Sequence, residues 1–491
     1  TPFSLGHEQV DVRHARAAVV RDHRAAARSK GVRCRDVADE QQGDVESAVV
    51  LKPRENKHGY VHIEVRRQHL ARVKRLPIMP PVTVDLVPRA GIHALELADG
   101  LGQACVGGEW LDQLVQLDQQ HWLLELFHGP TLAFKDVALQ LLGLLFEGFL
   151  AKRDRPLTIV GATSGDTGSA AIHAVAGRKN VEIFMLHPEG RVSEIQRRQM
   201  TTVSAPNVHN IAIAGSFDDA QAMVKRIFAD RDVTDTHRIG AVNSINWARV
   251  MAQIVYYFHA AVSLGAPDRP VSFAVPTGNF GNAYAGYAAR SMGLPIKRFI
   301  VGSNVNDILP RFFDSGTLEM AGVIPTISPS MDIQVSSNFE RLLFELNGRD
   351  GTVTSQSIID FRESGILSIE NNLWESVRKT FDGFRLDDTE TKAVIGEIHA
   401  ASGYLLDPHS AIGVAAAKAM VSDPTTPIVS LATAHPAKFA DVVEEASGLR
   451  PVLPQALANL YDRPERMTVL ANDLAQVETF VREHVNLRGA A

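Results

Sequence analysis

The sequence predicts a doubly wound α/β protein, in which the parallel sheets of two domains are covered by helices on both faces. Three observations carry this prediction. Short apolar segments rich in β-branched residues alternate with helical segments from about residue 121 onward. Most of the expected strands are apolar throughout, which is typical of parallel strands buried on both faces. The chain has 491 residues, too many for one hydrophobic core.

The alternation can be followed along the chain. The expected strands occupy residues 156–163, 182–188, 209–215, 269–278, 297–304 and 427–434. Expected helices begin at "SGDTGS", at "SEIQ" (193–196), at "SFDDAQ" and at "NFGNAY". "SEIQ" has the Ser-x-x-Gln form of a capping box, and the acidic pair in "SFDD" suits a helix start.

A Gly- and Pro-containing break at "LGAPDRP", near residue 265, indicates a domain boundary. We therefore expect a smaller α/β domain over 121–265 and a larger α/β domain over 266–491. The basic leader rich in Arg, His and Ala predicts an atypical, poorly ordered N-terminal region over 1–120.

Composition excludes several classes of protein. The content of 45% hydrophobic and 22% charged residues is typical of a soluble globular protein, and the net charge of −6 argues against a nucleic-acid binder. The longest apolar run, 137–151, is too short to cross a bilayer, so no membrane association is expected. Two cysteines form neither a disulfide framework nor a metal cluster, which predicts a cytoplasmic protein without a metal site.

The segment "LFHGPTLAFKD" (126–136) places one lysine, Lys135, at the start of this apolar run. A buried ammonium group is costly unless it is paired, has a lowered pKa or is chemically modified. The alternative is a lysine at a helix start whose head reaches water or pairs with Asp136 at the surface.

Two junctions between a strand and a helix are rich in Gly and small polar residues: "GATSGDTGS" (161–169) and "PTGNFGN" (276–282). Such loops offer free backbone N–H groups to an anion, although each alone is equally a plain tight turn. Neither has the Gly-Lys-Ser/Thr of a nucleotide-binding kinase. Two such loops together with a lysine able to form a Schiff base indicate pyridoxal phosphate.

Five motifs in order, "LFHGPTLAFKD", "ATSGDTG", "VNSINWAR", "PTGNFGN" and "TAHPAKF", make residues 121–450 resemble the longer form of the threonine synthase family. That family belongs to the fold-type II pyridoxal-phosphate enzymes, which implies a cofactor between the two domains. It also implies that the smaller domain carries the reactive lysine and a substrate carboxylate loop, and the larger one a cofactor phosphate loop. The resemblance implies that Lys135 holds the cofactor covalently. It implies further cofactor contacts from Asp166, Gly278, Asn279, Phe280, Gly281, Asn282 and Thr433. It assigns the substrate carboxylate to Thr163, Ser164 and Thr167, and the substrate phosphate to Ser244 and Arg249.

The implied reaction converts O-phospho-L-homoserine and water to L-threonine and phosphate, catalysed by a pyridoxal-phosphate-dependent lyase that is a monomer or a small homo-oligomer. Two alternatives stay open. A serine/threonine dehydratase would use the same lysine, but those enzymes usually have a run of glycines where this chain has "TGNFGN". A catalytically impaired relative is the second, because residues 1–120 lack the Ser-Thr-Arg-Gly segment and "DGG" turn of the family.

Overall fold

The computed structural model describes residues 49–55, 61–67, 83–86, 113–153, 156–230, 238–240, 242, 246–420 and 423–485. Most of the expected N-terminal region, 1–120, lies outside these ranges, so its atypical character stays a prediction. Contacts divide the chain into two compact units, Thr1–Lys52 with Glu64–Thr83 and Pro53–Ile63 with Val84–Ala491. A three-stranded sheet contains β1 (Val49–Glu55), β2 (Val61–Arg67) and β3 (Thr83–Leu86) in that order.

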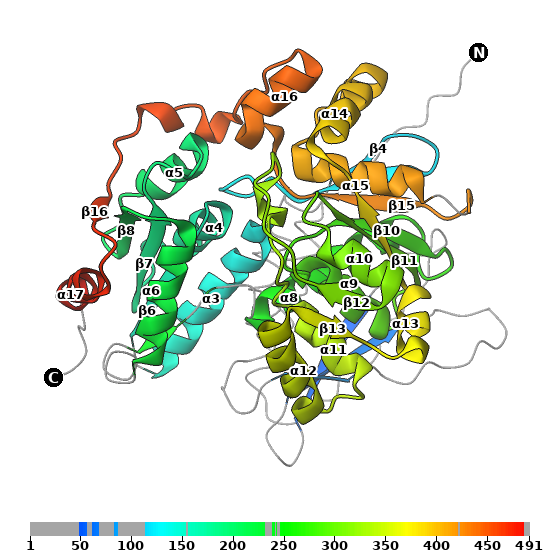
Figure 1. Ribbon diagram of the computed structural model, residues 1–491, viewed down its shortest axis with the longest axis horizontal. Helices are drawn as coiled ribbons and strands as arrows, with labels where there is room; N and C mark the ends of the chain where they lie inside the picture. The colour runs from blue at the N-terminus through cyan, green and yellow to red at the C-terminus, as the bar shows by residue number, and fades with distance from the viewer. Residues whose placement is uncertain are drawn as a thin grey trace, which may run out of the picture. The chain divides into compact units, whose positions relative to one another are not determined.

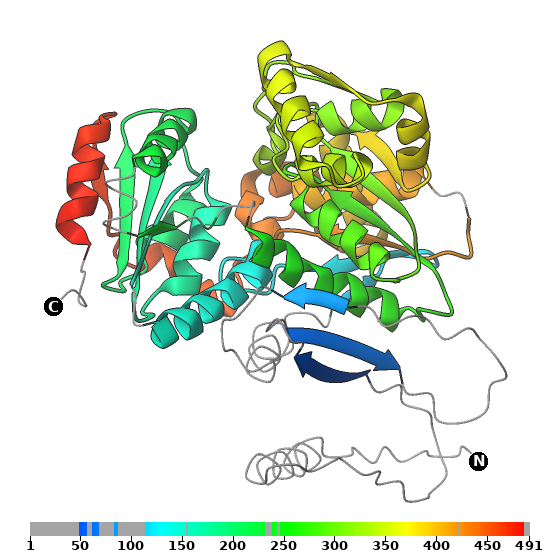
Figure 2. The same ribbon diagram turned by 90° about the horizontal axis from the view of Figure 1, so that it is seen from below.

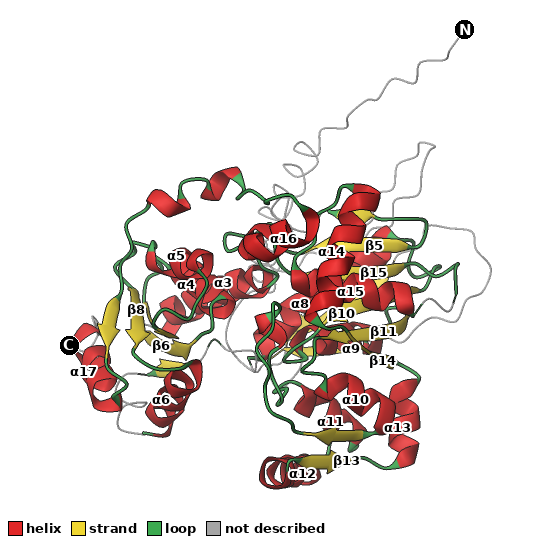
Figure 3. Ribbon diagram, turned by 45° about the horizontal axis from the view of Figure 1, so that its top comes forward, coloured by secondary structure: helices red, strands yellow, loops and turns green. Residues whose placement is uncertain are grey.

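The larger sheet of the second unit has six strands in the order β14-β11-β10-β15-β5-β4 (Figure 3). Their bounds are β14 Phe381–Arg385, β11 Ile296–Ser303, β10 Val271–Pro276, β15 Ile428–Ala432, β5 His121–Glu125 and β4 Leu114–Gln116. Every neighbouring pair is parallel except β4 and β5, so the one antiparallel strand is at the edge.

The smaller sheet has five strands in the order β16-β8-β7-β6-β9, all parallel. Their bounds are β16 Thr468–Leu470, β8 Val208–Ile213, β7 Val181–Pro188, β6 Leu157–Ala162 and β9 Ile239–Gly240. The six strands predicted from the sequence are all present, as β6, β7, β8, β10, β11 and β15.

Helices cover both faces of the two sheets (Figure 1). Those around the smaller sheet are α3 (Lys135–Arg153), α4 (Asp166–Val175), α5 (Glu194–Thr201), α6 (Phe217–Ala229) and α17 (Leu474–His484). Those associated with the larger sheet include α8 (Trp247–Ser263), α9 (Gly281–Ser291), α10 (Ile308–Ser315), α13 (Asn371–Arg378), α14 (Asp388–Ser402), α15 (Pro408–Ala419) and α16 (Ala440–Ser447). The hairpin β12 (Thr317–Glu319) and β13 (Ile366–Ser368) lies with α11 (Phe339–Leu346) and α12 (Gly351–Ser364). Figure 2 shows α3 lying alongside α8, with which it makes extensive contacts.

Alternate residues of each central strand pack into different cores, which explains why the strands are apolar throughout. In β6, Ile159 packs against α3 and α4, whereas Val160 packs against α6 and α17. In β10, Phe273 belongs to the core beneath α8 and α9, and Ala274 faces α15. A strand covered on both faces gains from apolar residues at every position.

Sheet membership departs from the boundary expected at residue 265. β5, expected in the smaller domain, pairs with β15 of the larger sheet, with Leu123 opposite Ser430. β16 and α17, expected in the larger domain, return to the smaller sheet, where Val469 lies opposite Ala212. The physical reason is that parallel partners are chosen by packing over long sequence distances, which a local Gly/Pro break does not report. In the described part of the chain, no helix has both the length and the hydropathy that a bilayer span requires.

Candidate active site

Four loops that leave the carboxyl ends of parallel strands contain most of the predicted site residues. The loop after β5 leads to Lys135, the loop after β6 contains "TSGDTG", the loop after β10 is "PTGNFGN", and Thr433 follows β15. In open α/β sheets, ligands bind beyond the carboxyl ends of the strands. The topology therefore brings these four loops, which come from distant parts of the sequence, to one region.

Lys135 is the first residue of α3, and its side chain is only 13% exposed. Its Nζ donates to Asp166 Oδ2 at 3.0 Å. Burial lowers the pKa of Lys135, and the positive charges of Lys438 and Arg249 lower it further, against the attraction of Asp166. The alternative reading of a surface pair with Asp136 is wrong, because that carboxylate is fully buried and bonded elsewhere.

Asp166, the first residue of α4, is a buried carboxylate shared by four donors. Its Oδ1 accepts from Lys438 Nζ at 2.6 Å and from Gln196 Nε2 at 2.8 Å. Its Oδ2 accepts from Lys135 and, at 3.4 Å, from Ser330 Oγ. Burial alone would raise the pKa of Asp166, but the charges of both lysines and the hydrogen bonds from Lys438 and Gln196 hold it well below the ordinary carboxyl value.

Sequence reasoning singled out neither Lys438, Gln196 nor Ser330. Lys438 lies within "TAHPAKF", one of the five quoted motifs, so its place there was the available signal. Gln196 was predicted only as part of a helix cap. The backbone N–H of Gln196 does donate to Ser193 Oγ, at 3.4 Å, but the side-chain amide of Gln196 also donates to Asp166. No local pattern marks Ser330.

A short antiparallel pairing joins the lysine loop to the segment after β15. Ala133 and Ala434 form a β-bridge, Phe134 N–H donates to Thr433 O at 2.9 Å, and His435 N–H donates to Leu132 O at 3.1 Å. Thr433 is itself buried, and its N–H donates to Ser410 Oγ at 3.0 Å. These backbone bonds fix Thr433 next to the start of α3.

The loop Gly278–Asn282 enters α9 tightly packed. Phe280 has a positive φ of 62° and is buried. A Cβ on Gly278 would lie 2.4 Å from Ser330 O, so this position admits only glycine without a backbone shift. Asn279 O accepts from Asn338 N–H at 3.1 Å, and its Oδ1 accepts from Ser337 Oγ at 3.3 Å.

Two buried donors beside this loop have no hydrogen-bond partner among the residues that the structure describes. The Nδ2 atoms of Asn282 and Asn338 are both buried without a hydrogen-bond acceptor. The Asn282 Oδ1 accepts from the hydroxyls of Tyr256 and Tyr257, which fixes the orientation of the amide. A Cβ on Gly281 would lie 3.2 Å from Asn338 Nδ2, so this second free amide borders the loop. Unpaired donors at a helix N-terminus fit an anionic group such as a cofactor phosphate.

The "TSGDTG" loop is shaped by Thr163, whose buried Oγ1 accepts from the N–H groups of Gly165 and Gly168, both at 2.9 Å. The side chain of Ser164 is exposed, and that of Thr167 is half-buried. Thr163 therefore has a structural part in the loop, whereas the other two side chains are accessible at the N-terminus of α4.

Arg249 lies in the first turn of α8 and is 4% exposed. Its Nη1 donates to Val242 O at 3.1 Å, and its Nε has no partner within the described ranges. Among the residues that the structure describes, no carboxylate pairs with it, which contradicts the plain alternative of a helix-surface ion pair. Burial lowers the pKa of Arg249 to about 10, so the group is still charged at neutral pH. Its predicted partner Ser244 lies outside the described residues.

The buried carboxylate of Asp136 leads to a prediction about stability. Burial raises the pKa of Asp136 to about 6, although hydrogen bonds from Thr131 and the charge of Lys438 oppose this shift. The folded chain holds the proton more tightly than the unfolded chain, so the contribution of Asp136 to the free energy of unfolding is greatest below pH 3.8. It decreases as the pH rises to about 6 and is constant above that.

We expect Asp136→Asn to remove this pH dependence. The free energy of unfolding of the variant, relative to the parent, should rise by on the order of 3 kcal/mol between pH 4 and pH 7. Denaturant titrations at four pH values measure it, with the exposed Glu363→Gln as the control. A constant difference between variant and parent would show that Asp136 is ionised throughout.

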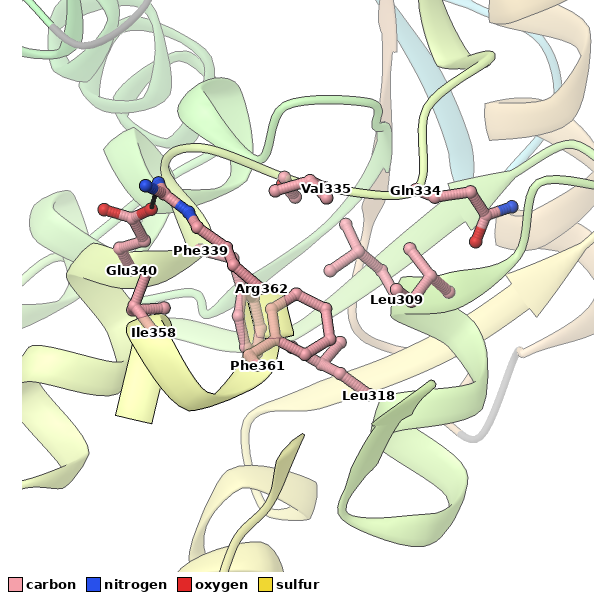
Figure 4. A pocket seen from close by; sticks show the side chains of 11 residues that line it. Leu309, Leu318, Gln334, Val335, Phe339, Glu340, Ile358, Phe361 and Arg362 are labelled. Atoms are coloured by element: carbon pink, nitrogen blue, oxygen red, sulfur yellow. Dashed lines mark hydrogen bonds and ion pairs between the residues drawn. The ribbon is translucent and has the colours of Figure 1, made fainter. Parts of the chain in front are cut away.

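Two cavities in the described part of the chain are alternative candidates for a ligand site. The first, about 10 Å³, is shown in Figure 4; its wall is largely apolar, with Leu309, Phe339 and Phe361, and the Arg362–Glu340 ion pair at 3.1 Å is also part of its lining. It has room for about one water molecule. The second, about 800 Å³, lies behind the lysine loop and is lined by Glu125, His128, Tyr404 and His435 among others. Neither is lined by Lys135, Asp166 or Arg249.

A buried lysine with a lowered pKa that bonds the loop after β6, together with a second glycine-rich loop after the parallel strand β10, is the arrangement expected of a pyridoxal-phosphate-dependent enzyme of fold type II. The sequence matches the family model described as "Pyridoxal-phosphate dependent enzyme" over residues 109–363 and that described as "Threonine synthase, C-terminal" over 410–481.

Individual relatives show which family of pyridoxal-phosphate-dependent enzymes is the relevant one. A threonine synthase of Pseudomonas aeruginosa is 56% identical over 374 residues, which cover 76% of this chain and 80% of the relative. The crystal structure of the threonine synthase from Brucella melitensis with bound pyridoxal phosphate matches with a TM-score of 0.78 and 51% identity, over 81% of this chain and 86% of that one. The yeast threonine synthase structure gives a TM-score of 0.74 at 41% identity, over 79% and 84%. The chain belongs to the threonine synthase family, and pyridoxal phosphate is its cofactor.

Proposed function

We propose that the enzyme converts O-phospho-L-homoserine and water to L-threonine and phosphate. One observation carries the choice of substrate: Arg249 is a buried guanidinium without a carboxylate partner in the described ranges, close enough to Lys135 for its charge to lower the pKa of that lysine. A buried, uncompensated cation beside the reactive amine is stabilised by an anionic substrate. A guanidinium suits a phosphate dianion because it offers a planar fork of donors.

Lys135 is the proposed catalytic residue. Its amine would hold the cofactor covalently and, once displaced by the substrate amine, would lie beside the substrate as a neutral base. The burial that lowers its pKa favours the neutral form that proton transfer requires. In the proposed sequence Lys135 removes the α-proton and then a β-proton, and phosphate leaves the γ-carbon. One proton returns to the γ-carbon, water adds its hydroxyl at the β-carbon, and a second proton returns to the α-carbon.

The cofactor, when bound, supplies the electron sink for the negative charge that develops at the substrate carbon. We assign its phosphate to the loop Gly278–Asn282, where the free amide nitrogens of Asn282 and Asn338 support the assignment. Thr433, after β15, and Asp166, at the start of α4, would hold its ring. The side chains of Ser164 and Thr167, with the N–H groups at the start of α4, would hold the substrate carboxylate, and Thr163 would shape that loop.

The phosphate assignment predicts a large effect at Gly278. In Gly278→Ala the new methyl group meets Ser330 O at 2.4 Å, so the loop must move relative to the short 3₁₀ helix η2 (Pro329–Met331). Overpacking of this kind costs about 1–3 kcal/mol, and we expect affinity for pyridoxal phosphate to fall about tenfold or more. Titration of the cofactor-free protein followed by absorbance measures it. The control is Gly322→Ala, where the added methyl group meets open space. Unchanged affinity in a folded Gly278→Ala variant would place the cofactor phosphate elsewhere.

The reaction itself is tested with purified protein supplied with pyridoxal phosphate. We expect equimolar phosphate and L-threonine from O-phospho-L-homoserine. Keto acid formed from L-serine or L-threonine at a comparable rate would favour the dehydratase alternative. A normal cofactor spectrum with no product from either substrate would favour the catalytically impaired relative.

We further propose that the enzyme acts in the cytoplasm, as a monomer or small homo-oligomer, on a small-molecule substrate and without nucleic acid or a metal ion. Within the described ranges no group of three or more His, Cys, Asp or Glu side chains could hold a metal. Full activity after dialysis against a chelator would support the metal-free reaction, and light scattering of the purified protein would give the oligomeric state.

A further inference from the structure

A second lysine in the site, Lys438, is more deeply buried than Lys135. It lies in the short 3₁₀ helix η3 (Pro436–Phe439), and its side chain is fully inaccessible. Its Nζ lies 2.6 Å from Asp166 Oδ1 and donates to Thr131 O at 2.8 Å. A buried ammonium group is retained only where its partners repay its loss of hydration. The proposed reaction gives Lys438 no part, so its burial needs another explanation.

The charges around Asp166 offer an explanation for the burial of Lys438. Two ammonium groups, Lys135 and Lys438, share this single carboxylate from opposite oxygens. Lys438 has a second acceptor, the backbone carbonyl of Thr131, whereas Lys135 Nζ donates to Asp166 alone among the residues that the structure describes. Lys438 therefore compensates the charge of Asp166, and Lys135 is the cation in excess. Besides Lys438, the cation Arg249 also lowers the pKa of Lys135, whereas the carboxylate of Asp166 raises it.

The same contacts hold three segments together. Lys438 joins the turn before α3, through Thr131, to the N-terminus of α4, through Asp166. The backbone pairing of Ala133 with Ala434 keeps the two lysine-bearing segments side by side. Without Lys438, Asp166 would be left with Lys135 as its only cationic partner in the described structure, and their ion pair would hold the Lys135 amine in its charged form.

We propose that Lys438 is a positioning residue for Lys135: it neutralises and anchors Asp166, so that the Lys135 amine stays available for covalent attachment of the cofactor. In that attachment the amine nitrogen bonds the aldehyde carbon of pyridoxal phosphate and one water molecule leaves. The inference rests on the proposed role of Lys135 and extends it to a residue to which no role was assigned.

The experiment follows attachment of pyridoxal phosphate to cofactor-free protein as a function of pH, by absorbance and by borohydride trapping at Lys135. Lys438→Gln keeps donors for Asp166 and Thr131 but removes the charge. We expect the pH midpoint of attachment to rise by about one unit or more, equivalent to about a tenfold loss of the reactive amine at a fixed pH below the midpoint. Lys438→Arg should keep the midpoint near that of the parent, and the exposed Lys418→Gln is the matched control.

A double variant separates charge from packing. In Asp166→Asn/Lys438→Gln the compensated pair is replaced by a neutral pair. Because Asp166 is itself assigned to the cofactor, this variant is followed by the pH dependence of acylation of Lys135 in cofactor-free protein, and the midpoint should be within about half a unit of the parent. This variant also decides the matter if Lys438→Gln alone does not fold, because it leaves no buried carboxylate unpaired.

A folded Lys438→Gln variant with the midpoint of the parent overturns the proposal, and so does a double variant whose midpoint differs by a unit or more. A purely structural role would lower stability in both lysine variants without moving the midpoint. Attachment is measured without O-phospho-L-homoserine, so failure here is distinguishable from failure of the proposed reaction.

Discussion

Lys135→Ala is expected to abolish turnover of O-phospho-L-homoserine, with the loss of proton transfer alone lowering the rate by about 10²–10⁴-fold. Loss of the covalent attachment adds to that effect. The fold should survive, because Asp166 keeps its ion pair with Lys438 at 2.6 Å when the Lys135 ammonium is removed. Assays of phosphate release, with far-ultraviolet circular dichroism as the check on folding, measure both.

Two further measurements make this prediction specific to Lys135. Borohydride reduction of the parent followed by peptide mapping should place the pyridoxyl label on Lys135, and a label on another lysine would contradict the assignment. Lys135→Arg keeps the positive charge beside Asp166 but has no amine to attach the cofactor, so it should be as inactive as the alanine variant. The exposed Lys418→Ala on α15 should have the activity of the parent.

Arg249→Ala is expected to lower turnover by about a hundredfold or more. Removing a charge-assisted contact to the substrate phosphate, which is also the leaving group, costs on the order of 2–4 kcal/mol, and this energy corresponds to that loss of rate. The absorbance of the bound cofactor should be unchanged, because the loop Gly278–Asn282 is assigned to the cofactor phosphate. Arg249→Lys should recover only part of the rate, because a point charge lacks the planar fork of donors.

Stability distinguishes this role from a structural one. Arg249 is buried without a carboxylate partner among the described residues, so its removal should leave the free energy of unfolding unchanged or higher. Normal turnover together with reduced stability would remove Arg249 from the site. The matched control is Arg362→Ala, which removes an exposed arginine paired with Glu340 at 3.1 Å and should change neither quantity by much.

How far the sequence alone could be interpreted differs between the elements and the site. The strands β6, β7, β8, β10, β11 and β15 were predictable, because a strand buried on both faces is a local run of apolar residues. Lys135 and Arg249 were found through the motifs that contain them. Their burial, by contrast, is a tertiary property. The apolar residues that follow Arg249 would be found in any amphipathic helix, and only the structure shows that no carboxylate in the described ranges approaches this arginine.

The N-cap interactions show the same division on a smaller scale. Ser216 and Asp219 form the complete capping box that a local acidic pattern suggests, because all of its atoms come from four consecutive residues. Gln196 looked equivalent in "SEIQ", yet its amide nitrogen bonds Asp166, thirty positions earlier in the chain. A short-range pattern cannot anticipate a partner that folding brings from another helix.

By itself, then, the sequence determined the α/β class and the order of the motifs, and it predicted a reactive lysine and two anion-binding loops, since each of these depends on a few neighbouring residues. Tertiary structure alone decided that β5 joins the larger sheet and β16 the smaller one, because parallel strands find partners across the whole chain. It also decided that Asp166 lies between Lys135 and Lys438, residues separated by about 300 positions, where burial strengthens every charge interaction. The chemistry of Lys135 depends on that arrangement, because the pKa of a buried amine is set by the charges that folding places around it.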